Sequence, residues 1–412
     1  MLNSAAFQAV AQAHFHHNFR RPLYDSYCFS KIPATIKNLL GNPTSGLPEG
    51  CTDGKTYDRV ILVFIDGFGW RFFDEYRDQY PFLKRFLDGG IASKITSQFP
   101  STTAAHVSCL NTGLEVGQSG MYEWFYYEPK LDRIIAPLLF SYAGDKEVGS
   151  LAKAHVDPQT VYPEDNLYRN LNVPAFVFQN VKIASSPCTQ AMFQGANHHP
   201  YHHFAQGLQE LSSLAAATSR GYFYIYFGDF DAQAHRHGIH SKAAKAAIDE
   251  CFTALEMHLK VPSRTALVMI ADHGMTEIDP KTTVYLNREI PLLEKHIQRN
   301  REGRLLTPAG SCRDYFLHIE PSALPEVEAI LSHHLKERAY IYRTEDLIEE
   351  GLFGSQEPST AFLSRVGNLV ILPTGNNSVW WYEQGRFEQK FFAMHGGLTP
   401  NELETPFLFQ SC

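Results

Sequence analysis

Three runs of apolar residues that end beside an aspartate constrain the fold of this chain more than any other feature. They are RVILVFIDG at 59–67, YFYIYFGDF at 222–230 and TALVMIADHG at 265–274, with shorter runs at 91–97 and 173–180. A continuous β-branched and aromatic run of this length predicts a strand that is buried on both faces. Helical patterns at 201–218 and 241–260 separate the later runs. Strand–helix alternation of this kind predicts an α/β fold with a mostly parallel central sheet and helices on both faces.

Changes in this alternation predict the domain boundaries. The chain has 412 residues, too many for one simple core, so a large domain with an insertion is expected. Residues 1–55 are interpreted as an N-terminal leader segment, and 56–275 together with 365–412 as the main core. Residues 276–364 mix short strand and helix patterns and are interpreted as a smaller, inserted α+β subdomain. The run at 367–383 is expected to return to the main sheet.

Charge and composition argue against several classes of function. The net charge is −8 and no long basic run is present, whereas binding to a nucleic-acid duplex requires Lys and Arg to neutralise phosphates. No run of 18 apolar residues predicts a membrane span, and the N-terminus lacks the pattern of a signal peptide. The seven widely spaced cysteines are typical of reduced thiols. A cytoplasmic protein is expected, with export by a signal-independent route left open, and the oligomeric state is not predicted.

Carboxylates and imidazoles recur where the predicted strands end. Taken alone, each aspartate could be a turn former or a helix cap, and each histidine a surface or core residue. Ligands of open α/β sheets, however, bind at the carboxyl ends of the strands. A set of carboxylates and imidazoles at that edge suits zinc or manganese. The six candidate metal ligands are Asp66, Asp231, His235, Asp272, His273 and His395.

The loop FPSTTAAH supplies a candidate nucleophile. Its hydroxyl residues Ser101, Thr102 and Thr103 precede a predicted helix. Hydroxyls at this place are usually N-caps. The N-terminus of a helix also favours an anion, and a nearby metal can activate a hydroxyl for attack on phosphorus.

In this order, the motifs IDG, PSTT before a helix ending in TG, D-x-x-x-H-x-x-G, ADHGM and HGG resemble the type I phosphodiesterase and nucleotide pyrophosphatase family of the alkaline phosphatase superfamily. The resemblance covers roughly residues 59–275 and 365–410. It implies an alkaline-phosphatase-like catalytic core that hydrolyses phosphodiester or pyrophosphate bonds with two divalent metal ions, zinc first and manganese as the alternative.

The resemblance also assigns roles to single residues. One metal ion would be held by Asp66, Asp272 and His273, and the other by Asp231, His235 and His395. The family's nucleophile, which is also a metal ligand, matches Thr103 by its spacing from Pro100 and Gly113. Thr102 and then Ser101 are the next candidates.

The chain departs from the family where a substrate is expected to bind. His106 and Trp124 stand near positions where the family has asparagines, and Asn111 is a possible substitute, so these three are the candidate substrate-binding residues. The preference between diesters and monoesters is therefore left open. A small phosphate ester or nucleotide is the expected partner. The alternatives are a phosphomonoesterase or phosphonate hydrolase on the same metal frame, and a catalytically inactive binding module.

Two further segments have both a functional and a structural interpretation. The aromatic run at 122–127 could form a wall on which a planar group stacks, or a strand that packs its aromatic side chains inward. The histidines of NHHPYHH, at 197–203, could bind a metal. Pro200 interrupts their spacing and no carboxylate is nearby, so a capped helix start before the segment HFAQGLQELSSL is favoured.

Overall fold

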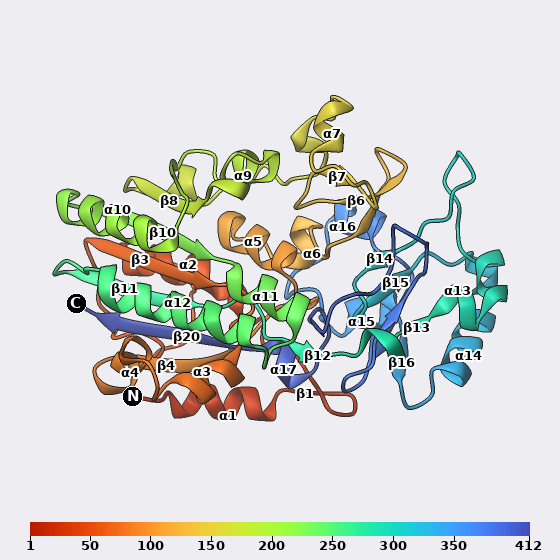
Figure 1. Ribbon diagram of the computed structural model, residues 1–412, viewed down its shortest axis with the longest axis horizontal. Coiled ribbons are helices and arrows are strands. Elements are labelled where there is room, and N and C mark those ends of the chain that lie inside the picture. Colours follow the sequence, from red (N-terminus) through yellow and green to blue (C-terminus); the bar gives the residue numbers. More distant parts are fainter.

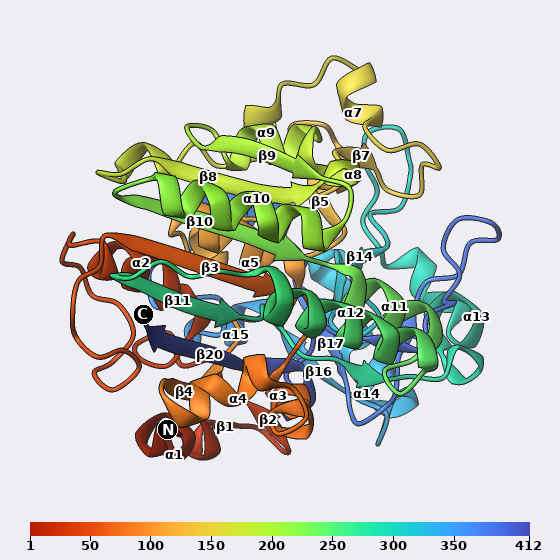
Figure 2. The same ribbon diagram turned by 60° about the vertical axis from the view of Figure 1, so that its left-hand side comes forward.

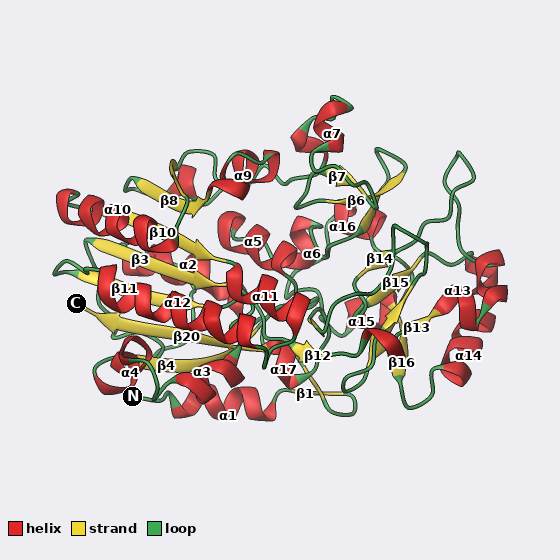
Figure 3. Ribbon diagram, in the orientation of Figure 1, coloured by secondary structure: helices red, strands yellow, loops and turns green.

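A computed structural model describes residues 1–412 and confirms the predicted α/β architecture. A seven-stranded sheet lies at its centre (Figures 1 and 3). In spatial order its strands are β4 (Ile91–Thr96), β20 (Glu404–Ser411), β11 (Thr265–Ile270), β3 (Arg59–Ile65), β10 (Gly221–Phe227), β8 (Ala175–Asn180) and β9 (Asn197–Tyr201). Strand β20 is antiparallel to both of its neighbours, and the other pairs are parallel. The sheet is therefore mostly parallel, as predicted.

Helices cover both faces of this sheet because successive side chains of a strand point to opposite sides. In β3, Leu62 and Phe64 belong to one hydrophobic cluster and Ile61 and Val63 to the other. The first cluster includes side chains of α2 (Ile32–Leu39) and α5 (Thr103–Thr112), and the second those of α3 (Trp70–Tyr76), α4 (Pro81–Asp88), α10 (Phe204–Ala217) and α12 (Lys242–His258). Figure 2 shows α10 and α12 lying over one face. Burial on both faces explains why the strand sequences are apolar throughout.

Residues 1–55 pack into this main core. Helix α1 (Ser4–Gln12) is capped by Asn3, whose side chain accepts a hydrogen bond from the Ala6 N–H. After the short strands β1 (His14–Phe15) and β2 (Phe19–Arg20), α2 buries Ile32 and Ile36 completely. These side chains belong to the same hydrophobic cluster as Leu62 of β3. The segment therefore contributes to the main hydrophobic core.

A smaller four-stranded sheet stands at one end of the molecule, at the right of Figure 1. Its strands, in order, are β14 (Ala309–Gly310), β15 (Tyr315–Leu317), β17 (Leu369–Pro373) and β16 (Ala339–Arg343), accompanied by α14 (Leu324–His334) and α15 (Thr344–Glu349). Strand β18 (Val379–Trp380) pairs with β13 (Val284–Tyr285). The prediction that 367–383 return to the main sheet is therefore wrong, and β20 is the strand that returns. A short apolar run fits either sheet, so its partner is chosen by tertiary packing.

The histidine-rich segment NHHPYHH forms an edge strand that leads directly into a helix. Residues 197–201 pair with β8 as β9, and α10 begins at Phe204 with His203 as its N-cap residue, so the predicted helix start is confirmed, although the His203 side chain makes no capping hydrogen bond. Pro200 is tolerated because an edge strand has no partner on its outer side. His199 Nδ1 lies 2.7 Å from Glu210 Oε1. None of the four histidines belongs to a group whose ligand atoms converge on a possible metal position.

All seven cysteines are free thiols, and six of them are buried. Burial raises the pKa of Cys28 to about 11, so this thiol keeps its proton at neutral pH. No helix combines the length and the apolar character that crossing a membrane requires.

Candidate active site

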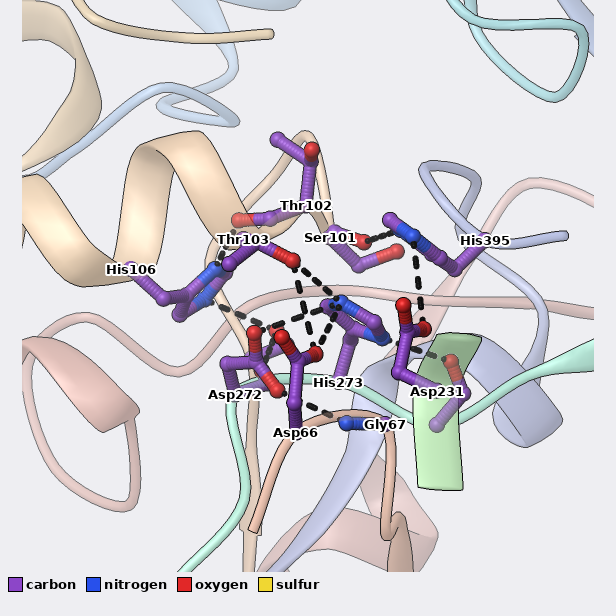
Figure 4. Close-up of polar contacts among 12 residues, drawn as sticks. Asp66, Gly67, Ser101, Thr102, Thr103, His106, Asp231, Asp272, His273 and His395 are labelled. Carbon is purple, nitrogen blue, oxygen red and sulfur yellow. Dashed lines mark hydrogen bonds and ion pairs between the residues drawn. The ribbon is translucent and has the colours of Figure 1, made fainter. Parts of the chain in front are cut away.

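The predicted metal ligands and nucleophile gather at the carboxyl ends of the central strands. They are Asp66 after β3, Asp231 and His235 in α11 (Asp229–His237) after β10, Asp272 and His273 after β11, His395 after β19 (Ala393–Met394), and Thr103 at the start of α5. Strand β19 pairs with β12 (Thr276–Glu277), which follows β11, and this pairing carries His395 to the same edge. Figure 4 shows the side chains of Asp66, Thr103, Asp231, Asp272, His273 and His395 converging from their separate elements. The structure therefore brings all seven residues into one pocket.

His273 stands at the centre of the first group of ligand atoms. Its Nε2 lies 3.4 Å from Asp66 Oδ1 and 3.3 Å from Asp272 Oδ2. Thr103 Oγ1 lies 3.1 Å from the same nitrogen and 3.4 Å from Asp66 Oδ1. The backbone N–H of Gly67 donates to Asp272 Oδ1 at 3.1 Å, which leaves Oδ2 facing His273. The candidate nucleophile is thus in contact with the predicted ligands of one metal ion.

Asp231 lies between this first group and a second group of ligand atoms, which it forms with His235 and His395. Its Oδ1 lies 3.3 Å from His235 Nε2 and 4.0 Å from His395 Nε2. The ligand atoms of these three residues lie within 4.8 Å of one another, and so do those of Asp66, Asp231 and His273. The rings of His273 and His395 are stacked, with their centroids 3.5 Å apart. The two predicted metal positions are therefore adjacent, and Asp231 can reach both.

All three imidazoles are oriented by backbone carbonyls. The Nδ1 atom lies 2.7 Å from Ala393 O in His235, 3.0 Å from Gly274 O in His273 and 2.9 Å from Ser101 O in His395. An Nδ1–H group that donates to a carbonyl leaves the Nε2 lone pair free and aims it into the pocket. Metal-binding histidines are commonly held in this way.

The electrostatics of the pocket favour a cation. Burial, together with the charges of Asp272 and Asp231, raises the pKa of Asp66 well above its usual value, and burial raises the pKa of Asp272 to about 7. Burial also lowers the pKa of His273 and of His395, which keeps both rings in the neutral, metal-binding form. The oxygens Asp231 Oδ1 and Asp272 Oδ2 are buried without a hydrogen-bond partner. A divalent cation would compensate these charges and give both oxygens a partner, so the residues fit a metal.

Of the three hydroxyls in FPSTTAAH, only that of Thr103 contacts the ligand groups. Ser101 Oγ donates to the Gly397 carbonyl at 2.7 Å and accepts from the Gly396 N–H at 3.2 Å. Thr102 is the N-cap residue of α5, and its side chain points away from the carboxylates in Figure 4. The geometry therefore favours Thr103 over the two other candidates.

The family model of type I phosphodiesterases / nucleotide pyrophosphatases matches residues 60–398. The chain belongs to this family. Its reaction is phosphodiesterase- or pyrophosphatase-type hydrolysis, typically with metal ions, so the chain is a hydrolase of that type.

Solved structures share the fold. Murine ectonucleotide pyrophosphatase/phosphodiesterase 5, as an inactive threonine-to-alanine variant in complex with AMP, gives a TM-score of 0.62 at 15% identity, with 85% of this chain and 87% of that chain covered. The human protein of the same name gives a TM-score of 0.60 at 16% identity, with 85% of this chain and 87% of that chain covered. Phosphonoacetate hydrolase from Sinorhizobium meliloti, in complex with phosphonoacetate, gives 0.59 at 15% identity, with 87% and 92% covered. No curated protein sequence matches the chain. At these identities the structural likeness establishes the fold alone.

Two of the three candidate substrate-binding residues are not available to a substrate. His106 is fully buried; its Nδ1 lies 2.7 Å from Thr102 O, and its Nε2 accepts from the Gln98 N–H at 2.8 Å. Asn111 is also fully buried, donates to Val107 O at 2.7 Å and accepts from a tyrosine hydroxyl at 2.5 Å. It lies two turns of α5 beyond the nucleophile position, roughly 12 Å along the helix. The prediction is therefore corrected, because both side chains support the loop and helix that carry Thr103.

Trp124 is the remaining candidate, and its neighbours in the aromatic run have a different role. Its side chain is 38% exposed, whereas Tyr122 and Tyr126 are fully buried and stack with ring centroids 5.3 Å apart. Strand β5 (Tyr126–Glu128) begins only after Trp124, so strict strand alternation does not apply here. Tyr122 and Tyr126 are core residues, Phe125 and Tyr127 are half-buried against the core, and Trp124 is the exposed aromatic residue of the run.

Tyr226 of β10 is a site residue that the sequence analysis missed. Its hydroxyl donates to Asp66 Oδ2, the carboxylate oxygen that does not contact Thr103. Burial and the charge of Asp66 raise the pKa of Tyr226, so the hydroxyl keeps its proton and remains a donor. One tyrosine inside an aromatic strand carries no signal of this role, because the neighbouring tyrosines of β10 are core residues.

Tyr226→Phe is expected to weaken metal binding. Loss of the hydrogen-bond partner of a metal ligand typically lowers the metal affinity about 10- to 100-fold. Activity should recover as the metal concentration is raised. Competition with a chromogenic chelator measures the effect. Tyr224→Phe on the same strand is the matched control, because the Tyr224 hydroxyl has no hydrogen-bond partner. Equal metal affinity in the two variants would remove Tyr226 from the site.

Arg313 is a second residue that was missed, and it secures the turn after His395. It is fully buried and forms an ion pair with Glu402, with Nη2 and Oε2 2.9 Å apart. Glu402 Oε1 in turn accepts from the Gly397 N–H at 3.1 Å. The pair joins the smaller subdomain to the His-Gly-Gly turn. Its partners are 89 positions apart in the chain, and no local pattern connects them.

Proposed function

We propose that the protein hydrolyses a phosphodiester or pyrophosphate bond of a small, nucleotide-like substrate through a phosphothreonine at Thr103. The observation that carries this proposal is the position of Thr103 Oγ1, which lies 3.1 Å from His273 Nε2 and 3.4 Å from Asp66 Oδ1. Both contacts are with predicted ligands of one metal ion, so the hydroxyl lies where a bound cation could activate it.

The chain's own groups prepare both halves of the reaction. Asp66 accepts the Thr103 hydroxyl proton and orients Oγ1 for in-line attack on phosphorus, and the leaving oxygen departs on the opposite side. The first turn of α5 presents unpaired N–H groups and the positive end of the helix dipole to the phosphoryl oxygens. The leaving oxygen takes a proton from solvent. Water then attacks phosphorus from the side that this oxygen vacated and releases a proton to solvent, while Oγ1 leaves and recovers its proton from Asp66. Two displacements give overall retention of configuration.

We propose two divalent cations at this site. Asp66, Asp272, His273 and Thr103 would hold one, and Asp231, His235 and His395 the other. Mixed imidazole and carboxylate ligands favour zinc, with manganese as the alternative. When bound, such ions act as Lewis acids that stabilise the charge on the entering and leaving oxygens.

The printed descriptions of the similar structures support a nucleotide-like substrate. Murine ectonucleotide pyrophosphatase/phosphodiesterase 5 binds AMP, and the variant that lacks one threonine is inactive. The relative that binds phosphonoacetate keeps a phosphonate hydrolase as the second candidate. The exposed Trp124, at 38%, offers a planar group a surface to stack on.

The test compares an aryl phosphodiester, the matching monoester and phosphonoacetate on zinc-loaded protein. We expect the diester to have the highest kcat/KM, by about tenfold or more, a difference of about 1.4 kcal/mol in the barrier. If phosphate is released faster from the monoester, the proposed activity would be that of a phosphomonoesterase. If it is released faster from phosphonoacetate, the proposed activity would be that of a phosphonate hydrolase. No turnover of any of the three would favour an inactive binding module.

A further inference from the structure

A second polar recess lies apart from the catalytic pocket. It has a volume of about 240 Å³ and is formed by β6 (Arg133–Ala136), the residue after β7 (Ser141–Tyr142), the segment 300–307 and the hairpin 381–387. Figure 1 shows β6 and β7 on the side away from the central sheet. None of the seven catalytic-pocket residues lines it. The recess is therefore separate from the catalytic residues and lies between β6, β7 and the segments 300–307 and 381–387.

Three arginines dominate the charge of this recess. Arg133, Arg304 and Arg386 line it together with one acid, Glu383, so its charged side chains sum to +2. The whole chain has a net charge of −8. A local excess of positive charge in an acidic protein attracts anions to that place.

The protein compensates these guanidinium groups incompletely. A single oxygen, Glu302 Oε2, lies 3.5 Å from Arg133 Nη1 and 3.1 Å from Arg304 Nε. The Glu302 side chain is 59% exposed, so both ion pairs are screened by water. The other guanidinium nitrogens of Arg133 and Arg304 have no hydrogen-bond partner in the protein. Both side chains therefore keep donors free for a ligand.

Two of the arginines are held in place before any ligand arrives. Arg386 donates to the Ala143 carbonyl at 2.9 Å and pairs with Glu383 at 2.7 Å. Its Nε passes over Gly144, where a Cβ atom would lie only 2.8 Å away, so the glycine makes room for it. The guanidinium of Arg133 lies 4.9 Å from the ring centre of Tyr142. Ordered side chains lose less entropy when they bind, which favours recognition.

We propose that this recess binds the phosphate group of a small molecule, independently of the catalytic pocket. Guanidinium forks match phosphate oxygens in geometry and charge, and three of them from separate segments can surround one tetrahedral dianion. Inorganic phosphate and a phosphomonoester such as AMP share this chemistry. A duplex nucleic acid does not fit, because the recess is small and the chain is acidic.

Titration calorimetry of metal-loaded protein with inorganic phosphate, and separately with AMP, tests the proposal. We expect two classes of site in the wild type, one of which is lost or weakened about tenfold in Arg304→Gln, because a charge-assisted contact is removed. Arg301→Gln is the matched control, since it removes the same charge from the same exposed loop but does not line the recess. Its binding should stay within twofold of the wild type.

The Arg304-dependent class should persist in Thr103→Ala, so its detection does not depend on hydrolysis. If AMP shows it and inorganic phosphate does not, the ligand is a phosphomonoester; the reverse result identifies free phosphate. The proposal is overturned if the wild type shows one class only, or if Arg304→Gln and Arg301→Gln bind both anions alike. Arg386→Gln, which alters a second segment, should reproduce the loss seen with Arg304→Gln.

Discussion

Thr103→Ala should reduce turnover by at least about 10⁴-fold, because removing the attacking group of a covalent mechanism costs this much or more in other hydrolases. The substitution deletes the one hydroxyl that contacts both Asp66 and His273. Alanine suits the first turn of a helix, and the six other ligands remain, so fold and metal content should be kept. Steady-state kinetics with the aryl diester and metal analysis by mass spectrometry measure both quantities.

Thr102→Ala provides the matched control one residue earlier. Its hydroxyl is buried and faces away from the carboxylates, so kcat should change far less than in Thr103→Ala. Thr103→Ser keeps an oxygen and should retain part of the activity. If Thr102→Ala were the inactive variant and Thr103→Ala the active one, the assignment of the nucleophile would be wrong by one position.

Removal of metal should have the second large effect. We expect a chelator to lower activity by at least about 1,000-fold, since the Lewis-acid stabilisation that the ions supply is worth several kcal/mol. It should also lower the thermal midpoint, because the buried carboxylates then lack their counter-charge. A cation at 1,000 times its dissociation constant stabilises the fold by about 4 kcal/mol per site. Activity and thermal unfolding are followed before and after dialysis, and after zinc or manganese is restored.

The pH dependence of metal binding has a definite sign. In the metal-free pocket burial raises the pKa of Asp272 to about 7, so below that pH a cation must displace a proton. Metal affinity should therefore increase as the pH rises toward and through 7.

The chelation experiment has one outcome that would contradict the proposed mechanism, namely activity that survives exhaustive chelation with no metal detected.

The central strands and the positions of the candidate metal ligands could be predicted because both depend on local sequence. A strand buried on two faces must be apolar along its length, and its end is marked by an aspartate such as Asp66 or Asp272. The pair Asp231 and His235 is marked by helical spacing. Each of these signals lies within ten residues of chain, and the structure brings the seven predicted residues into one cluster.

The predictions that were wrong involved segments whose environment is made by distant parts of the chain. Residues 369–373 joined the smaller sheet between β15 and β16 and not the main sheet. Residues 197–201 form an edge strand beside β8 that the sequence pattern did not predict. His106 was a candidate because of its spacing from the nucleophile position, and Asn111 as a substitute for an absent asparagine, but packing placed both inside the protein.

The sequence by itself determined the fold class, the family and the set of residues that can bind metal, because periodicity and short motifs are properties of neighbouring residues. Only the tertiary structure decided that Asp231 reaches both groups, that Tyr226 holds Asp66, and that three arginines from separate segments share one recess. Such contacts join positions far apart in the chain. They depend on how sheets and loops pack, and no local pattern encodes that packing.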